Sequence, residues 1–577
     1  MQRLALPSLP VELLCHILSY LDAHQLAHAR KICKVVKAAI DHSELLQYII
    51  DLGFYNVVEA GPPQISIQSQ AAVSVPVPVA MRRKELRELE ASWQRLRYRG
   101  RCGFSLPVSG PIYDFMGGIY ALAGEGGLRF AVLPHGHETQ PVRTWNHNID
   151  TISMIDLTFC PFQDLLVIVT MTADNHNHAY DVHLKTLATN QPHPHAALPV
   201  LQALKQSDTA TDSFHAGGPV KLQVMGNYLA LLCRDVVAND SYVGDYLQLW
   251  TWTDARGYEF ILYFEDSVND FSFLSEDRFL LLADDGTIEL YSFTDKTRAP
   301  QCTAKLGMPK LMHDWQLAEA FLGSSPTPGI VGVAPPFMNP RTASSNHDDQ
   351  TSARMSMPVF YPDADDQLLA FHVTVVRQTN EADTHPFVYF VRRSSLLRLE
   401  DTYVVHLAFS DVGASDTASS SDRSSEHLPW GLWGPSSTQW FPDTNQTDWQ
   451  HSVYGFRTVE SLNEDITREY FSREPRKLRV RDFNPNMTWN YHGEDREGWT
   501  GKLVLPQPPP LPPESGSSDA LGAEAEENEV QRPFKERLGK ALPYREMVSE
   551  ETFDVTDTMM DESRILLLRR VSVSLDL

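Results

Sequence analysis

Histidines are the residues of this 577-residue chain whose spacing first suggests chemistry. Three His-x-His pairs occur: His135 with His137, His176 with His178, and His193 with His195. Residues two apart in a strand point to the same face, so each pair could present two imidazoles to one metal ion. The pairs lie among Gly, Asn, Ala and Pro in segments that read as loops, and only Glu138 adds an adjacent ligand. We therefore expect solvent-exposed histidines and no metal site.

Motifs for phosphate binding and nucleophilic catalysis are not found. The sequence contains no G-x-x-x-x-G-K-[ST] loop, no G-x-S-x-G turn and no H-E-x-x-H helix. Six cysteines are scattered without a C-x-x-C pair, which favours reduced, mostly buried thiols over a zinc site or a disulfide framework. Trp430, Trp433 and Trp440 could form a carbohydrate or peptide platform, but we expect them to pack in the core and loops. We predict no enzyme activity and no cofactor.

The charge of the chain limits its partners. With 74 acidic and 49 basic residues, the net charge is −25. Such a surface repels the phosphates of nucleic acids and anionic membranes, so we expect neither as a partner and favour a basic or neutral protein. The first twenty residues lack the apolar block of a signal peptide, and no apolar run is long enough to span a membrane. We expect a soluble protein of the cytoplasm, the nucleus or both.

The stretch from Leu9 to Gln47 has the strongest local pattern. Pro10 suits the first position of a helix, because its fixed φ fits and its missing N–H needs no partner there. Two adjacent apolar rows follow, formed by Leu13, Leu14, Ile17, Leu18 and Leu21. Asp22 can cap a second helix containing Leu26, and a third begins near Arg30. Three such short helices bury too little surface alone, so one apolar row should dock against a partner.

These residues resemble the F-box, the module by which substrate receptors attach to the Skp-type adaptor of a cullin-RING (SCF) ubiquitin ligase. The resemblance covers residues 5–50 and is carried by the Leu-Pro opening and the paired leucines. It departs from many F-boxes where a Cys-x-x-Trp is usual, because Val36 follows Cys33 at that spacing. It implies the adaptor and the cullin scaffold as partners, with these adaptor-binding residues: Leu9, Pro10, Leu13, Leu14, Ile17, Leu18, Leu21, Leu26, Cys33 and Val36. A helical cap that seals the rest of the protein is the alternative.

A linker and a helix are expected to join this module to the rest. Residues 51–80 contain prolines and lack a helical period, which indicates a linker. Residues 81–100 form one amphipathic helix whose apolar side carries Leu86, Leu89, Trp93 and Leu96. Its other side is rich in arginine and could be an interaction patch, but glutamates alternate with the arginines, so we expect a solvated face.

From residue 108 to 577 the sequence is typical of β-structure. Residues 272–293 are the clearest module, with three strands separated by turns at 275–277 and 284–286, as in one blade of a β-propeller. About ten blades of roughly 45 residues would fit, more than the usual four to eight. We therefore predict about seven blades with disordered insertions near 341–355, 411–427 and 506–532. The last strands are expected to pair with the first, and no His-Ser-Asp-Trp set of regular WD repeats is evident.

The order of segments also resembles fungal F-box proteins with a propeller-like C-terminal region. The matching stretches include YDFMGGIYALA, CPFQDLLVIV and MMDESRILLLRR. The resemblance implies the substrate-recognition subunit of an SCF ligase, with the F-box on the adaptor and the propeller on an unidentified protein target. The alternative is a propeller scaffold that mediates protein interactions without ubiquitin transfer.

Overall fold

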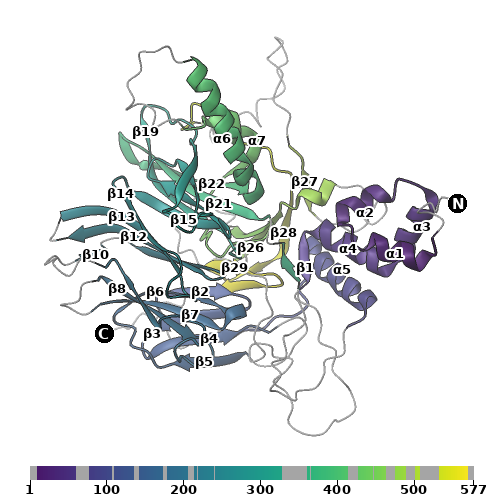
Figure 1. The fold of residues 1–577 in the computed structure, drawn as a ribbon, viewed down its shortest axis with the longest axis horizontal. Helices are drawn as coiled ribbons and strands as arrows, with labels where there is room; N and C mark the ends of the chain where they lie inside the picture. Colours follow the sequence, from purple (N-terminus) through teal and green to yellow (C-terminus); the bar gives the residue numbers. More distant parts are fainter. Residues whose placement is uncertain are drawn as a thin grey trace, which may run out of the picture.

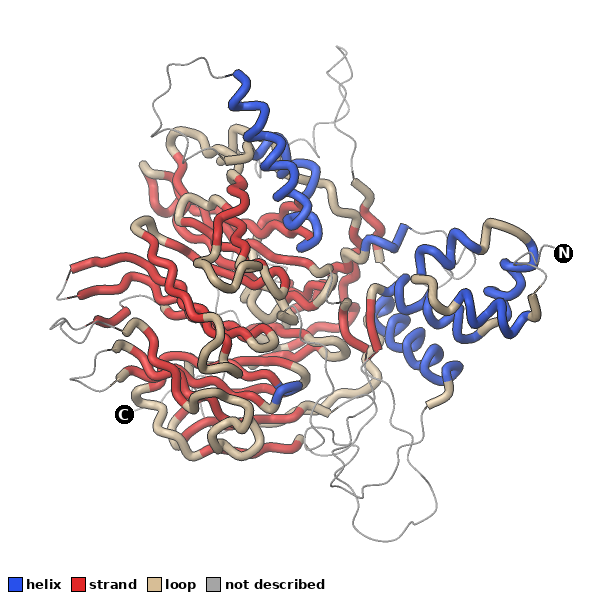
Figure 2. The backbone as a smooth tube through the Cα atoms, viewed as in Figure 1, coloured by secondary structure: helices blue, strands red, loops and turns tan. Residues whose placement is uncertain are grey.

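The computed structural model has a helical N-terminal part attached to a larger body of strands (Figures 1 and 2). The strands form layered sheets, and the helices α1 to α5 lie together at one side of them (Figure 1). The structure describes residues 9–59, 77–106, 110–134, 142–172, 178–205, 214–216, 219–238, 241–327, 360–363, 366–413, 427–445, 447–462, 475–488, 501–506 and 532–569.

Five helices make up the N-terminal part: α1 (Val11–Leu18), α2 (Ala23–Ala29), α3 (Lys34–His42), α4 (Glu44–Tyr55) and α5 (Val79–Arg95). Pro10 caps α1 instead of occupying its first position. Asp22 caps α2 as predicted, because its carboxylate accepts the Gln25 N–H at 2.7 Å while the Gln25 side chain accepts the Asp22 N–H. The third helix begins at Lys34, later than the predicted Arg30.

The prediction did not include α4, which occupies residues 51–55 of the expected linker. A short strand, β1 (Val57–Glu59), follows it and pairs with β20 (Phe360–Pro362), far along the chain. Helix α5 has the predicted apolar side, since Leu86 and Trp93 are buried and Leu89 and Leu96 pack partly buried beside them.

Within the described residues, six antiparallel sheets of four or five strands follow in chain order. Sheet 1 contains β2 (Tyr113–Met116), β3 (Ile119–Gly124), β4 (Gly127–Val132) and β5 (Arg143–His147); sheet 2 contains β6 (Met154–Cys160), β7 (Leu165–Met171), β8 (Tyr180–Thr186) and β9 (Val200–Ala203); sheet 3 contains β10 (Phe214–Ala216), β11 (Val220–Met225), β12 (Tyr228–Ala238), β13 (Ser241–Thr251) and β14 (Glu259–Phe264).

The remaining sheets continue this order. Sheet 4 contains β15 (Val268–Ser275), β16 (Arg278–Ala283), β17 (Ile288–Ser292) and β18 (Gln301–Leu306); sheet 5 contains β19 (Trp315–Gly323), β21 (Leu368–Arg377), β22 (Asn380–Arg392) and β23 (Thr438–Pro442); sheet 6 contains β24 (Val453–Tyr454), β25 (Arg457–Leu462), β26 (Arg476–Asp482), β27 (Lys502–Val504) and β28 (Tyr544–Phe553); sheet 7 has two strands, β29 (Asp557–Met560) and β30 (Ile565–Leu568). Within sheet 4, the predicted strands and turns of residues 272–293 are confirmed.

Apolar clusters join each sheet to the next around a closed ring. One cluster each lies between sheets 1 and 2, 2 and 3, 3 and 4, 4 and 5, and 5 and 6. In sheet 7, Met560 packs with Val480 of sheet 6, and Met559 packs with Phe115 of sheet 1. Strands of neighbouring sheets also lie side by side, as β2 does with β6 and β6 with β11. This is the arrangement of a β-propeller, so the fold class is propeller-like as predicted.

The ring closes differently from the prediction. Strands β29 and β30 pair with each other, and among the described residues sheet 7 contacts sheet 1 by side-chain packing instead of strand pairing. In the part of the ring that the structure describes, six sheets of at least four strands and the two-stranded sheet 7 therefore stand where about seven blades were expected. Nearly all of the three predicted insertions lies outside the described residues.

Two helices replace predicted β-structure or loop in sheet 5. Helix α6 (Arg393–Gly413) continues directly from β22, although RRSSLLRL was interpreted as part of a strand. Its Leu396 is buried, and Glu400 accepts hydrogen bonds from Thr303 and Arg278 of sheet 4. Helix α7 (Trp430–Ser437) precedes β23. The strand-like alternation of β22 does not continue into α6, because packing against sheet 4 favours a helix there.

Sheet 5 also contains a hydrogen-bond set that was not evident in the sequence. Trp449 Nε1 donates to Asp443 Oδ2 at 2.7 Å, and His372 Nδ1 lies 3.1 Å from the same oxygen. His372 Nε2 is 2.9 Å from Thr374 Oγ1. The residue types of a WD repeat thus meet in this sheet, and the long separation between His372 and Trp449 hid them from a search by spacing.

Candidate functional site

The two apolar rows of α1 have different surroundings. Leu14 and Leu18 are 1% and 3% exposed and lie in the core of the helical module. Leu13 and Ile17 are 52% and 43% exposed, and they lie one turn apart on the same side of the helix. One row therefore holds the module together, and the other is open to a partner, as predicted.

The ten residues assigned to adaptor binding divide in the same way. Pro10, Leu13 and Ile17 are exposed, whereas Leu9, Leu21 and Cys33 are half-buried. The other four, which are Leu14, Leu18, Leu26 and Val36, are buried in the module core. Their side chains shape the helices and do not offer contact surface in this structure.

Other exposed apolar side chains of the module were not assigned from the sequence. Val11 and Tyr20 belong to α1 and the turn after it. Ile32 lies in the turn before α3 and Val35 in the first turn of α3, which packs against α1. Tyr20 and Ile32 are the most exposed, at 79% and 75%. Large apolar residues seldom face water in a strongly acidic chain without a function. The presence of these four residues beside the predicted helices was the signal that could have identified them.

Arginines of α5 connect the module to this helix. The buried Asp51 of α4 accepts hydrogen bonds from Arg83 and Arg87, with Nε to Oδ2 distances of 2.7 and 2.8 Å. Arg82 likewise pairs with Glu59 at 2.7 Å. Arg82, Arg83 and Arg87 are therefore bound by acidic residues of α4 and β1 and do not form an interaction patch. Lys84 on the same helix is 76% exposed and pairs with Glu88, as expected of a solvated face.

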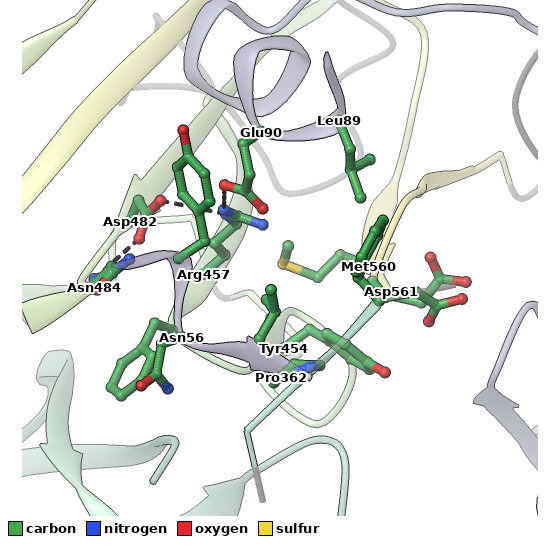
Figure 3. Close-up of a pocket in the computed structure, with 15 residues that line it drawn as sticks. Asn56, Leu89, Glu90, Pro362, Tyr454, Arg457, Asp482, Asn484, Met560 and Asp561 are labelled. Atoms are coloured by element: carbon green, nitrogen blue, oxygen red, sulfur yellow. Dashed lines mark hydrogen bonds and ion pairs between the residues drawn. The ribbon is translucent and has the colours of Figure 1, made fainter. Parts of the chain in front are cut away.

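A small cavity marks the place where the helices meet the ring (Figure 3). Its volume is about 30 Å³, enough for a single water molecule and too small for a substrate. Lining residues come from α5, sheet 6, β20 and the turn after β29, and Glu90, Arg457 and Asp482 form a chain of ion pairs along it (Figure 3).

The charged side chains at this joint are buried and form ion pairs with each other. Burial raises the pKa of Glu90, and the nearby Arg457 opposes that shift. The carboxylates of Glu90 and Asp482 in turn raise the pKa of Arg457. The Asn484 amide donates to the Phe54 carbonyl at 2.9 Å, which ties sheet 6 to the end of α4. This network fixes the helical module against the propeller-like ring.

The residues singled out for other chemistry have structural surroundings. His178 is buried beside Asp181, and His193 is buried with Nε2 2.9 Å from the Gln163 carbonyl, so the expectation of exposed histidines is wrong for both. His135, His137 and His176 lie outside the described residues. His195 donates its backbone N–H to His193. Within the described ranges, no three His, Cys, Asp or Glu side chains are placed to hold a metal ion.

The three tryptophans pack as predicted. Trp430, Trp433 and Trp440 are buried in the cluster between sheets 4 and 5. The indole N–H of Trp430 donates to the Arg537 carbonyl at 2.8 Å, and that of Trp433 donates to the Gly307 carbonyl at 3.0 Å. The cysteines are free, but only Cys160 and Cys233 are buried, so the expectation of mostly buried thiols is wrong.

The fold and the surface define a class of protein in which a helical module with one exposed apolar row is followed by a propeller-like ring. Comparison with protein families finds that residues 6–49 match the model described as F-box-like. The N-terminal module is therefore F-box-like. A comparison with curated proteins finds no significant match. Across the described part of the chain, no helix is long and apolar enough to span a membrane.

Solved structures with distant similarity were also found. A structure of S. cerevisiae Dbp5 bound to Nup159, Gle1, IP6 and ADP matches with 10% identity, 66% of this chain, 72% of that chain and a TM-score of 0.26. The N-terminal domain of Nup159 matches with 9% identity, 63% and 68% coverage and a TM-score of 0.26. Kluyveromyces lactis Hsv2p matches with 10% identity, 51% and 70% coverage and a TM-score of 0.23. These TM-scores are too low to support an argument, so the propeller-like fold is inferred from the strand pairing and sheet contacts given above.

Proposed function

We propose that this protein is the substrate-recognition subunit of an SCF ubiquitin ligase. In this proposal the F-box-like module binds the Skp-type adaptor, the adaptor connects it to the cullin scaffold, and the ring binds a protein target. The observation that carries the proposal is the open apolar row of Leu13 and Ile17 within the residues that match the F-box-like family.

The joint between module and ring supports a protein with two separate binding parts. A receptor accelerates ubiquitin transfer by holding its target near a catalytic subunit, so its two binding parts must keep a defined separation. Glu90 of α5 pairs with Arg457 of sheet 6, Asn484 donates to the Phe54 carbonyl of α4, and β1 pairs with β20. These contacts limit the motion of the module relative to the ring. The protein would act in the cytoplasm, the nucleus or both, where SCF ligases work.

Affinity purification of the full chain from its native cell tests this proposal. The adaptor and cullin should co-purify with the chain, and target proteins should accumulate on it when the proteasome is inhibited. A Leu13→Asp chain should lose adaptor and cullin while retaining the targets, since the ring is unchanged.

Two results would contradict the proposal. Adaptor without cullin would favour a scaffold that takes no part in ubiquitin transfer. Recovery of adaptor and cullin by the Leu13→Asp chain would place their binding surface elsewhere.

A further inference from the structure

Three aromatic rings form a cage at the seam between sheets 3 and 4. Tyr228 begins β12, Tyr258 directly precedes β14, and Phe293 follows β17. The Tyr228 and Phe293 rings are nearly perpendicular, with an interplanar angle of 84° and centroids 5.3 Å apart. The Tyr258 ring lies 5.8 Å from Phe293 on the same cluster. We refer to Tyr228, Tyr258 and Phe293 as the aromatic cage.

Lys296 places its ammonium group in this cage. Its Nζ lies 3.8 Å from the Phe293 centroid, 4.3 Å from Tyr228 and 5.5 Å from Tyr258. A cation over aromatic faces at these distances gains cation–π energy. Lys296 belongs to the exposed loop between β17 and β18, and within the described residues no carboxylate lies at ion-pairing distance from it. The rings are thus its main partners, and the lysine enters from a surface loop.

The hydroxyl group of Tyr258 gives a second, independent indication of a ligand. Tyr258 is 6% exposed, and its buried hydroxyl has no hydrogen-bond partner among the described residues. Buried hydroxyls are normally paired, so one without a partner can bind a polar group that reaches it. Burial raises the pKa of Tyr258, with smaller contributions from Tyr228 and Asp295.

We propose that the aromatic cage is a binding site for an alkylated ammonium group and that Lys296 occupies it as an internal competitor. Such a group is present in trimethyllysine and in choline. Methyl groups contact the rings directly and weaken hydration of the cation, so an alkylated ammonium enters an aromatic cage more readily than the strongly hydrated ammonium of lysine. The net charge of −25 attracts any cation to this protein.

The position of the cage relates it to the F-box-like module. Tyr228 lies in the β11–β12 connection, Tyr258 in the β13–β14 connection and Phe293 in the β17–β18 connection, while β20 lies in the β19–β21 connection of sheet 5. In antiparallel sheets around one ring these connections lie at the same end. A ligand in the cage would therefore be bound on the side of the ring that carries the module. Its use for recruiting a ligase target rests on the proposed function, whereas ligand binding itself does not.

Calorimetry on the purified full chain tests the site without any adaptor. The probes are choline, its neutral carbon isostere 3,3-dimethylbutan-1-ol, and a short peptide containing trimethyllysine. Lys296→Ala empties the cage and should bind choline about tenfold more tightly than the native chain, because the internal competitor is gone. Arg298→Gln removes the same charge from the same loop and should bind like the native chain. The neutral isostere should bind at least about tenfold more weakly than choline.

The proposal is overturned if Lys296→Ala binds choline no better than the native chain, or if the neutral isostere binds as well as choline. Neither comparison alters a ring, so a folding defect cannot explain the result. Adding Tyr228→Leu to Lys296→Ala should abolish choline binding, with the melting temperature measured alongside. Tighter binding of the trimethyllysine peptide than of choline would assign the site to a protein ligand, and equal binding would assign it to a small amine. Both assignments support the cage.

Discussion

At the scale of single residues, Asp51 shows how much the packing of α4 on α5 depends on one buried charge. Its carboxylate is fully buried and holds Arg83 and Arg87 of α5. We expect Asp51→Asn to lower the free energy of unfolding by about 3 kcal/mol, since both arginines lose their anion in a partly buried place. Urea denaturation measures this cost. Asp41→Asn is the matched control, because its pair with Arg30 is partly exposed and should be worth at most about 1 kcal/mol. Equal costs for the two variants would contradict this account of the contact between α4 and α5.

Asp156 on β6 makes stability depend on pH. Burial raises its pKa to about 7, although its carboxylate accepts the Leu157 N–H at 2.8 Å. An unfolded aspartate has a pKa of about 3.9, so between roughly pH 4 and 7 the folded state binds more protons and its stability falls as the pH rises. Asp156→Asn should therefore gain stability relative to the native chain across this window and keep that gain above pH 7. Melting temperatures at several pH values check this, and a difference that does not change with pH would contradict it.

Residue patterns predicted only part of the N-terminal surface, because Leu13 and Ile17 are exposed but four of the ten residues assigned to adaptor binding are buried. Helical spacing alone separated Leu13 and Ile17 from Leu14 and Leu18, because adjacent rows of one helix cannot both face the same small core. Spacing could not show which row would be exposed. The aromatic cage was not predictable either, since Tyr228, Tyr258 and Phe293 come from three separate turns that only the stacking of sheets 3 and 4 brings together.

At the scale of elements, the two strands of sheet 7 close the ring through Arg564, whose side chain is 16% exposed. Arg564 pairs with Asp561 at 2.7 Å and donates to the Pro134 carbonyl of the segment after β4 at 2.9 Å. Arg564→Ala should cost about 3 kcal/mol of unfolding free energy, because Asp561 and Glu562 are left buried without their cation. Hydrogen exchange should increase most in β29, β30 and sheet 1.

Arg569→Ala provides the comparison for ring closure, since its pair with Asp554 is exposed on both sides. It should change exchange little. If Arg564→Ala leaves exchange in sheet 1 at the native level, sheet 7 is not what closes the ring.

Element prediction was accurate where local signals agree with packing. Residues 272–293 gave strands and turns correctly, because alternation and the Asp-Gly turn point to the same hairpins. The prediction was wrong for α6, because its first residues, RRSSLLRL, follow an apolar strand without a break. It was also wrong for the closing strands, because their pairing with each other depends on contacts across the whole ring. A single sequence gives no information on such long-range contacts.

At the scale of the whole molecule, the F-box-like module and the ring form two surfaces with a fixed joint. Buried ion pairs, the β1–β20 pairing and the small size of the cavity leave little room for the module to turn (Figure 3). Both parts and the helix α5 between them could be predicted from the sequence. The joint could not, because Phe54, Glu90, Arg457 and Asn484 are spread over more than four hundred positions.

Direct binding of the purified chain to a purified Skp-type adaptor tests the central claim. The native chain should bind, and Leu13→Asp or Ile17→Asp should weaken binding about a hundredfold, because a charge would be desolvated against an apolar partner surface. Their melting temperatures should stay native, since both side chains are exposed. Val404→Asp on α6 is the control, being an equally exposed apolar residue outside the module, and it should bind normally. Native affinity in the Leu13 and Ile17 variants, or no binding by the native chain, would contradict the account.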